Sequence, residues 1–384
     1  MAPLDFGNPR RCGAFRARPE GEATAAGSSA DTQSEATRSR ALRLCFVAMA
    51  THLLVGNPTA QSRKNEEHID QALSLMKRVG IEGDLLLTLP GGKTIAAVRS
   101  ALDRGAYRVV IAMGGDGTFR EVAAGLYTSQ RKDDVALGML PTGTANDQGK
   151  SFGLEAGPEA LERNIDVIRA AHETRLDVGI YRSGGASEPP DYFFDCAGWG
   201  LSARVLAQRN KDRAVVETLG PLKGLYRDQA VYAGAFVKTF LESYVVDDKL
   251  RVVATLDGKR LELDGLTDLI VKNTRVYAGA WVFEESARHD DGVFELVPFV
   301  GKRDWVSKAL IDLESVPLDQ EMLAEIGLEH SKTLRASTMD FEIFDPEGGA
   351  PLAAQLDGEE WPAHPKVRID VAARALRLLV PRGA

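Results

Sequence analysis

The 384-residue sequence is poor in cysteine and histidine and lacks an excess of basic residues. Its three cysteines, Cys12, Cys45 and Cys196, have no CxxC spacing, and its six histidines have no HExxH spacing. Neither a disulfide framework nor a structural zinc site is therefore predicted, and we expect a reducing compartment. The 47 Lys and Arg residues against 55 Asp and Glu residues give a net charge of −8, which argues against broad nucleic-acid binding.

Long apolar runs are also missing from the sequence. The most apolar stretch near the N-terminus, Leu42–Gly56, is interrupted by Arg43 and His52 and is shorter than the roughly 18 apolar residues of a spanning helix. About forty mostly small or charged residues precede this stretch, which is not the pattern of an export signal. We therefore expect a cytoplasmic protein without a membrane span.

Residues 1–48 have no apolar periodicity and are rich in Gly, Ala, Ser and charge. Such a segment cannot bury enough surface to offset the entropy of ordering it, so we predict a disordered, dispensable tail. Met49 would then be a natural start for the folded chain. The alternative is that Leu42–Ala48 extends the first strand at the edge of a sheet.

Residues 49–170 alternate apolar runs with amphipathic stretches, which predicts a parallel sheet covered by helices. We expect ligand-binding loops at the carboxyl ends of its strands. The expected strands are Leu53–Gly56, Asp84–Leu89, Val109–Met113 and Val135–Leu140, and the expected helices are Asn65–Val79 and Lys93–Asp103.

Residues 171–384 change to short strands separated by turn residues such as Asp257-Gly258, which favours a β-sandwich. One helix is expected near 224–242. The expected strands are Leu176–Tyr181, Tyr192–Cys196, Leu250–Leu256, Lys259–Asp264, Leu269–Asn273, Val293–Phe299, Met339–Phe344 and Pro365–Val380. The predicted class is thus α/β: a three-layer parallel-sheet nucleotide-binding domain followed by a β-sandwich domain, whose last strand is a candidate to return to the first domain.

The sharpest motif is Gly114-Gly115-Asp116-Gly117, which follows the buried-type strand Val109–Met113. Glycines let backbone amides and a helix N-terminus approach an anion, so the motif predicts a phosphate-binding loop. A carboxylate in such a loop needs a divalent cation or a substrate hydroxyl between it and the phosphate. Asp116 therefore indicates phosphoryl transfer, the alternative being a helix cap at a glycine-rich turn.

A second loop of glycine, hydroxyl and Asx residues, Pro141–Asp147, follows the next predicted strand and would share the same crevice. Gly91-Gly92-Lys93-Thr94 is not a Walker A motif, because that pattern requires glycine where Leu87 stands. Two further carboxylate turns, Asp290–Val293 and Asp357–Glu359, would each be an ordinary hairpin turn if they stood alone.

In combination and in this order, the motifs resemble those of the diacylglycerol kinase catalytic-domain family, the bacterial lipid kinase branch related to sphingosine and ceramide kinases. The resemblance runs from Leu53 to about Pro381 and includes Asn57-Pro58, the glycine motif, the Pro141 loop and Asp357-Gly358-Glu359. It implies an ATP-dependent lipid kinase with Mg²⁺ as cofactor and a membrane lipid as its partner.

Specific roles follow from the resemblance alone. It implies that Asp291 and the backbone carbonyls of Arg288 and Val293 hold Mg²⁺, and that Glu359 accepts the proton of the lipid hydroxyl. The residues themselves leave open whether Asp116 or Glu359 takes this proton, or whether Asp116 ligates the catalytic magnesium. The residues implied to surround ATP are Asn57, Pro58, Thr59, Ala60, Gln61, Thr88, Gly115, Asp116, Gly117, Thr118, Phe119, Arg120, Glu121 and Thr144.

Two departures from the family bear on the substrate. Arg120 stands where family members commonly have asparagine, and Arg204 stands where sphingosine kinases have an acidic residue. Since a cation cannot pair with an amino headgroup, we expect a neutral alcohol, diacylglycerol, with phosphatidate as the product. The alternatives are another lipid or soluble alcohol and, in a different class, a nucleotide-binding regulator without catalysis.

The segment Val205–Tyr226 mixes basic and apolar residues, which favours peripheral contact with the anionic inner face of a membrane. The alternative is a solvated helix and loop, and a homodimer is left open. The residues expected to make this contact are Leu206, Arg209, Lys211, Arg213, Val215, Val216, Leu219, Leu222 and Lys223.

Overall fold

The computed structural model places Val47–Ala384 in one compact unit. The residues it describes are 50–58, 65–143, 145–183, 188–218, 249–277, 281–282, 284, 286–300, 304, 332–344 and 352–383. The tail predicted over residues 1–48, the alternative for Leu42–Ala48 and the helix expected near 224–242 lie outside this description.

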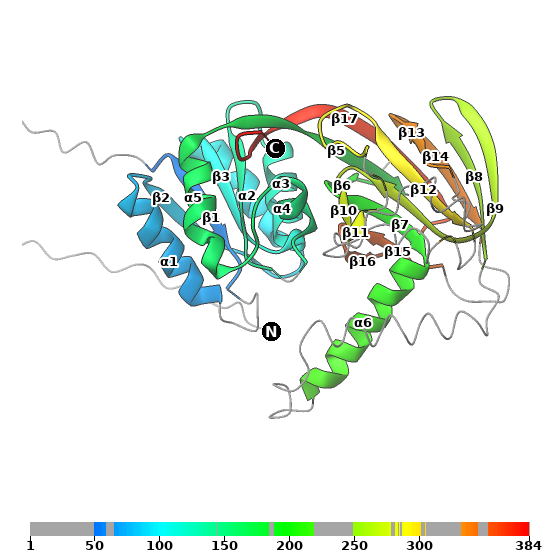
Figure 1. The fold of residues 1–384 in the computed structure, drawn as a ribbon, viewed down its shortest axis with the longest axis horizontal. Helices are drawn as coiled ribbons and strands as arrows, with labels where there is room; N and C mark the ends of the chain where they lie inside the picture. The colour runs from blue at the N-terminus through cyan, green and yellow to red at the C-terminus, as the bar shows by residue number, and fades with distance from the viewer. Residues whose placement is uncertain are drawn as a thin grey trace, which may run out of the picture. The chain divides into compact units, whose positions relative to one another are not determined.

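The first part of the unit is a parallel sheet whose strand order is β2-β1-β3-β4 (Figure 1). All residues of β3 and β4 are buried, as expected for strands covered on both faces. The strands are β1 (His52–Gly56), β2 (Gly83–Leu87), β3 (Val109–Gly114) and β4 (Ala136–Pro141).

Helices cover both faces of this sheet and make three layers (Figure 1). The helices α1 (Asn65–Arg78) and α5 (Leu161–Ala170) pack on one face, where Ile69 and Ile165 meet Ile111. The helices α2 (Lys93–Arg104) and α3 (Asp116–Tyr127) pack on the other. A short helix α4 (Asp147–Ser151) and a 3₁₀ turn (Pro158–Ala160) follow β4. The predicted three-layer α/β arrangement is confirmed.

The second part is antiparallel and rich in β-strands, with a core that includes Trp199, Phe294 and Phe341. Its main strand path is β17-β14-β8-β9-β7-β15-β16, while β12, β13, β5 and β6 pair beside it. The bounds are β5 (Glu173–Ser183), β6 (Asp191–Phe193), β7 (Cys196–Gly200), β8 (Leu250–Leu256), β9 (Lys259–Lys272), β10 (Val276–Tyr277), β11 (Trp281–Val282), β12 (Phe294–Val300), β13 (Leu334–Ala336), β14 (Thr338–Phe344), β15 (Ala354–Leu356), β16 (Glu359–Trp361) and β17 (Lys366–Leu379).

The last strand, β17, joins the two parts of the sheet. Its first half pairs antiparallel with β14, for example Asp370 with Thr338, and its second half pairs in parallel with β4, where Arg377 faces Ala136. The long strand β5 runs antiparallel to β17 through both halves (Figure 1). The β-rich region is therefore continuous in hydrogen bonding with the parallel sheet.

The strands differ from the sequence prediction in two places. The strand expected at Tyr192–Cys196 is split into β6 and β7, because the amides of Phe194 and Asp195 donate to the Asp357 carboxylate instead of to a neighbouring strand. The two strands expected at 259–264 and 269–273 are one strand, β9. The helix α6 (Leu201–Thr218) overlaps the segment Val205–Tyr226, for which a helix and loop was the alternative interpretation. Its first turn is capped by Asp268 of β9, which accepts from Ser202 N at 2.9 Å.

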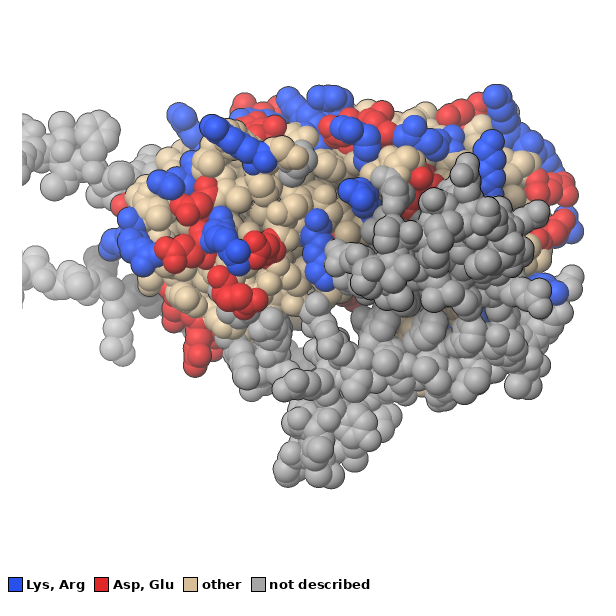
Figure 2. All heavy atoms as spheres, viewed as in Figure 1, with Lys and Arg blue, Asp and Glu red and all other residues tan. Residues whose placement is uncertain are grey.

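The charged surface of the α/β part mixes both signs, as Figure 2 shows for one face. Arg78 of α1 pairs with Glu162 of α5, and Arg169 pairs with Asp166 at 2.9 Å. Exposed pairs of this kind contribute roughly 0 to 1 kcal/mol each, so they tune the surface rather than hold the fold. Within the described part of the chain, we find no helix with the length and apolar content needed to cross a bilayer.

Candidate active site

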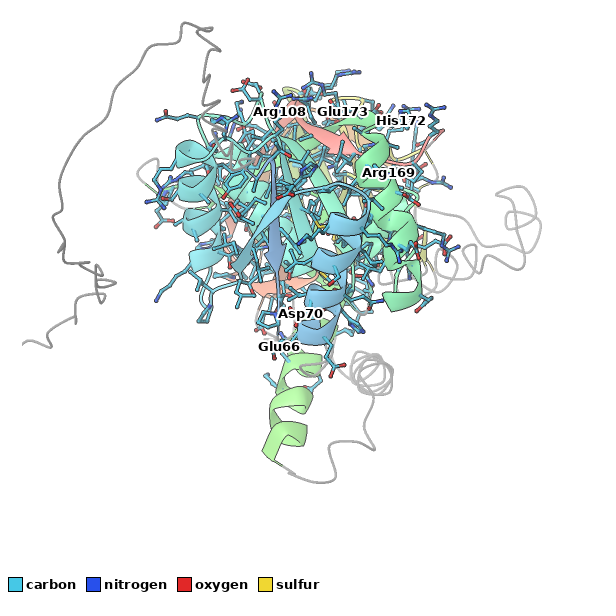
Figure 3. All side chains as sticks on the ribbon, turned by 90° about the vertical axis from the view of Figure 1, so that its left-hand side faces the viewer. Glu66, Asp70, Arg108, Arg169, His172 and Glu173 are labelled. Atoms are coloured by element: carbon cyan, nitrogen blue, oxygen red, sulfur yellow. The ribbon has the colours of Figure 1, made fainter. Side chains whose placement is uncertain are left out.

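The carboxyl ends of β1, β3 and β4 meet at one edge of the sheet. Hydrogen bonds continue past the strands there: Asn57 N donates to Met113 O at 3.1 Å, and Thr142 N donates to Gly114 O at 2.9 Å. Figure 3 places Glu66 and Asp70, in the first two turns of α1, at this end of the layer and Arg108, His172 and Glu173 at the opposite end. The loops after the strands therefore lie together, as the sequence predicts.

Two glycines bring the loops after β3 and β4 into backbone contact. A Cβ at Gly143 would lie 2.4 Å from the Cα of Gly115, so no side chain fits between the two loops. The Asn146 side chain holds the second loop, accepting from Gly143 N and donating to Gly143 O, both at 2.9 Å. The result is an edge lined by backbone, which is the form a phosphate-binding loop requires.

Asp116 is the first residue of α3 but does not cap the helix. The N-cap is Gly115, without a side-chain cap, while Asp116 Oδ1 accepts a hydrogen bond from Gln148 N of α4 at 3.3 Å. Burial, with the nearby Asp195 carboxylate adding to it, raises the pKa of Asp116 to about 6. Asp116 is thus a half-buried residue whose carboxylate faces the start of α4, directly after the second loop.

The other residues implied to surround ATP divide into three groups. Asn57 Nδ2 donates to Thr118 Oγ1 at 3.2 Å, and Thr88 N donates to Gly56 O at 3.0 Å, so these residues lie at the strand ends. Phe119 instead packs in the core, with its ring centroid 5.6 Å from that of Phe152, and can offer a ligand only its backbone. The residues Thr59, Ala60, Gln61 and Thr144 lie outside the described chain.

Glu359 reaches the same edge from the far end of the sequence. It begins β16, after a two-residue hairpin turn in which Asp357 and Gly358 have φ values of 48° and 73°. Its Oε1 atom lies 3.1 Å from the position of a Cβ at Gly117, in the first turn of α3. The structure therefore places Glu359 against the residue that directly follows Asp116 in α3.

Asp357 anchors the hairpin to the segment between β6 and β7. Its carboxylate accepts hydrogen bonds from the amides of Phe194, Asp195 and Cys196 at 3.0, 2.8 and 3.0 Å. Burial, with Asp195 adding to it, raises the pKa of Asp357 to about 7, although these amides and Arg120 favour the charged form. Asp357 is therefore a structural residue of the site as well as a turn residue.

A buried ion pair that the sequence analysis missed lies behind these carboxylates. Lys272 Nζ is 2.6 Å from Asp195 Oδ1, and the two side chains are only 1% and 4% exposed. Lys272 also donates to Val276 O at 2.8 Å, and Thr274 donates to Asp195. Burial is the largest single effect and lowers the pKa of Lys272, but Asp195 and other neighbouring groups together raise the pKa above its ordinary value. The sequence signal that could have indicated this buried pair is a lysine directly after the apolar run Leu269-Ile270-Val271.

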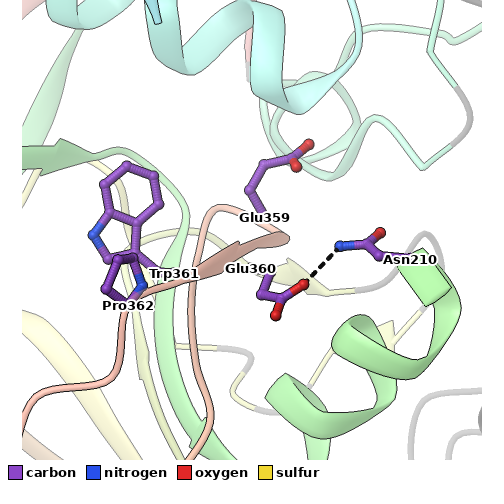
Figure 4. A pocket seen from close by; sticks show the side chains of 5 residues that line it. All are labelled: Asn210, Glu359, Glu360, Trp361 and Pro362. Carbon is purple, nitrogen blue, oxygen red and sulfur yellow. Dashed lines mark hydrogen bonds between the residues drawn. The ribbon is translucent and has the colours of Figure 1, made fainter. Parts of the chain in front are cut away.

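A cavity of about 520 Å³ opens beside Glu359 (Figure 4). At its border Asn210 Nδ2 of α6 donates to Glu360 Oε2 at 3.3 Å. The residues lining it are Asn210, Glu359, Glu360, Trp361 and Pro362. Glu359 thus lies between the first turn of α3 and a cavity large enough for the headgroup of an acceptor.

The carboxylate implied to hold magnesium, that of Asp291, is engaged with protein groups instead. Asp291 Oδ1 accepts from Val293 N at 3.2 Å, and Oδ2 is paired with Arg335 of β13, which also binds Glu295 Oε1 at 3.0 Å. Because a guanidinium already neutralises the carboxylate, the arrangement does not fit a magnesium ion at Arg288, Asp291 and Val293. In the described chain no cluster of three or more His, Cys, Asp or Glu side chains could hold a metal. The reaction proposed below therefore uses no metal ion at Asp291.

The segment expected to contact a membrane is only partly described. Val205 and Leu206 are 2% and 5% exposed and pack at the base of α6, so Leu206 does not face a lipid surface as expected. The side chains of Arg209, Arg213, Val215 and Val216, and all of Leu219, Leu222 and Lys223, lie outside the description. Membrane contact through this segment stays a prediction.

With this geometry in place, comparison with known proteins identifies the domain. The family model of the diacylglycerol kinase catalytic domain matches residues 51–181, which span β1, the glycine loop and the loop after β4. The match covers about a third of the chain. The resemblance inferred from the motifs is confirmed, and it supports a kinase.

Relatives extend this kinase likeness beyond the matched domain. A "Probable lipid kinase YegS-like" of Chromohalobacter salexigens is 29% identical over 341 residues, covering 87% of this chain and 94% of its own. A diacylglycerol kinase of Staphylococcus saprophyticus is 28% identical over 244 residues, covering 64% and 71%. The crystal structure of a diacylglycerol kinase of Bacillus anthracis has the same fold, with a TM-score of 0.61 at 16% identity, covering 87% of this chain and 98% of its own.

Proposed function

We propose that the protein is an ATP-dependent lipid kinase that transfers the γ-phosphoryl group of ATP to a lipid hydroxyl, with diacylglycerol as acceptor and phosphatidate as product. The observation that carries the proposal is the position of Glu359 against the first turn of α3, between the glycine loop and a cavity. Its support from the comparisons is the kinase domain at residues 51–181 and relatives named as lipid and diacylglycerol kinases.

In this proposal the donor is the magnesium complex of ATP, bound at the backbone-lined edge formed by Gly115 and Gly143. Amides there and the N-terminus of α3 offer positive ends of dipoles to the phosphate oxygens. Phosphoryl transfer needs little covalent chemistry from the protein, so most of the acceleration comes from alignment and charge stabilisation.

Glu359 acts on the acceptor. Its carboxylate accepts the proton of the lipid hydroxyl while the hydroxyl oxygen forms a bond to the γ-phosphorus and the bond to the β-phosphate oxygen breaks, releasing ADP. A positioned general base of this kind contributes about 10² to 10⁴-fold to the rate. Asp116, half-buried at the start of α3 and next to Gly117 in the sequence, lies on the phosphate side of the same edge.

The choice of a neutral acceptor rests on charge. Arg204 of α6 stands where an acidic residue would be needed to hold an amino headgroup, and a cation there disfavours a sphingoid base. We further propose that the enzyme works from the cytoplasm, as a peripheral protein at the inner membrane face.

Lipid-dependent consumption of ATP tests the proposal. The purified protein is mixed with ATP and vesicles of diacylglycerol, monoacylglycerol, ceramide or sphingosine, or with glycerol as a soluble alcohol. We expect ADP release only with lipid, fastest with diacylglycerol. Turnover with glycerol alone would indicate a kinase of soluble alcohols, and ATP binding without turnover on any acceptor would indicate a regulator.

A further inference from the structure

The hairpin strand β16 touches helix α3 at two places. Glu359 lies against Gly117, and the Cζ atom of Arg120 lies 4.6 Å from the ring centroid of Trp361. The indole is also fixed at its N–H group, because Trp361 Nε1 donates to Asp191 Oδ2 at 3.2 Å. Trp361 is therefore held on its face by α3 and at its N–H group by β6.

The two contacts are in register. Glu359 and Trp361 are two residues apart on a strand, so their side chains leave the same side of β16. Gly117 and Arg120 are three residues apart on a helix, so they are neighbours on one face of α3. A shift of β16 along α3 would consequently break both contacts together.

Two carboxylates also lie within electrostatic reach of Arg120: Asp191, which binds the indole N–H group, and Asp357, in the turn before β16. The positive charge of Arg120 favours the charged form of both. In the part of the chain that the structure describes, the Nε atom of Arg120 is buried without a hydrogen-bond partner. The resemblance places Arg120 among the residues around ATP, yet its guanidinium lies over Trp361. The guanidinium is therefore held by attraction to the Trp361 ring and to these two carboxylates, all of which lie at or beside β16.

We propose that Arg120 is a positioning residue: by binding the face of Trp361 it holds β16 on α3 and keeps the Glu359 carboxylate where it can accept the proton of the acceptor hydroxyl. This inference rests on the proposed function, in which Glu359 is the base. Arg120 then acts through Glu359 and not on the nucleotide.

The test is the cost of removing Arg120 in two backgrounds. Arg120→Met is made in the wild-type chain and in Glu359→Gln, and transfer of labelled phosphate from ATP to diacylglycerol vesicles is measured. In the wild-type background we expect kcat to fall about 3- to 30-fold with KM for ATP changed less than twofold. In the Glu359→Gln background we expect no further fall, because the group that Arg120 positions is already inactive.

Four further variants make the test specific. Arg120→Lys retains a cation over the ring and should recover most of kcat. Trp361→Leu should cost as much as Arg120→Met, and the double variant no more than either single one. Lys132→Met is the matched control. Lys132 Nζ lies 5.2 Å from the ring centroid of Tyr127, at the far end of α3. The substitution also removes a cation from an aromatic ring, but it should leave kcat unchanged.

Two results would overturn the positioning role while leaving the kinase assignment intact. One is an equal loss from Arg120→Met in both backgrounds, which would mean that Arg120 acts independently of Glu359. The other is a collapse of ATP affinity, which would place Arg120 in the nucleotide site. A wild-type protein that phosphorylates no lipid would instead contradict the proposed function itself.

Discussion

The Oε1 atom of Glu359 lies 3.1 Å from the point that a Cβ at Gly117 would occupy. These two residues come from opposite ends of the folded chain, one from the helix that follows the glycine loop and one from the C-terminal hairpin. Their contact places a carboxylate beside the N-terminus of α3. It is also one of the two contacts between β16 and α3 at the candidate site.

Gly117→Ala should therefore disturb catalysis more than folding. The added methyl group would displace the Glu359 carboxylate, which can rotate away, while alanine suits the α3 helix better than glycine by about 1 kcal/mol. We expect kcat for lipid phosphorylation to fall roughly tenfold with an unchanged or slightly raised melting temperature. Steady-state kinetics and thermal unfolding check this. An unchanged kcat would show that the contact does not matter to the reaction.

Lys272→Met should be strongly destabilising. It would leave the Asp195 carboxylate buried without its partner, close to the carboxylates of Asp116 and Asp357. Breaking one side of a buried ion pair typically costs about 3–5 kcal/mol. Urea unfolding measures the loss, and the double variant with Asp195→Asn should regain much of it because the remaining group is neutral. A single variant as stable as the wild type would rule out this role.

The raised pKa of Asp357 predicts a dependence of stability on pH. Because the folded-state pKa of about 7 is above the ordinary value near 4, the folded protein holds a proton that the unfolded chain loses. The free energy of unfolding that this proton contributes is fully present below about pH 4 and is lost as the pH rises to 7.

Asp357→Asn should remove this part of the dependence. The variant will be less stable overall, because an amide replaces a carboxylate that accepts three backbone hydrogen bonds. Its unfolding free energy should nevertheless fall less steeply between pH 4 and 7 than that of the wild type. Chemical denaturation at a series of pH values gives both slopes. Parallel slopes would mean that Asp357 is ionised throughout this range.

Much of the nucleotide domain could be predicted because its signals are local. The apolar run Val109–Met113 and the glycines after it fix a buried strand, a turn and a helix within one short segment, and the structure has β3 and α3 there. Neighbouring strand ends of a parallel sheet meet at one edge, so the position of the Pro141 loop beside the first loop also followed from order alone.

The remaining features depend on contacts between distant residues. The break between β6 and β7 is caused by Asp357, and the start of α6 is capped by Asp268 of β9; neither partner is near in sequence. The contact of Arg120 with Trp361 and the pairing of Asp291 with Arg335 are of the same kind. A pattern of residue types along the chain carries no information about which distant side chain will meet a given one.

The most direct test of the account is transfer of labelled γ-phosphate from ATP to diacylglycerol in vesicles by the wild-type protein and by Glu359→Gln. We expect labelled phosphatidate from the wild type, and a kcat that is lower by about 10² to 10⁴-fold in the variant, with ATP affinity and folding retained. Transfer by Glu359→Gln at the wild-type rate would contradict the role of Glu359 as the base, and with it the mechanism built on its contact with Gly117.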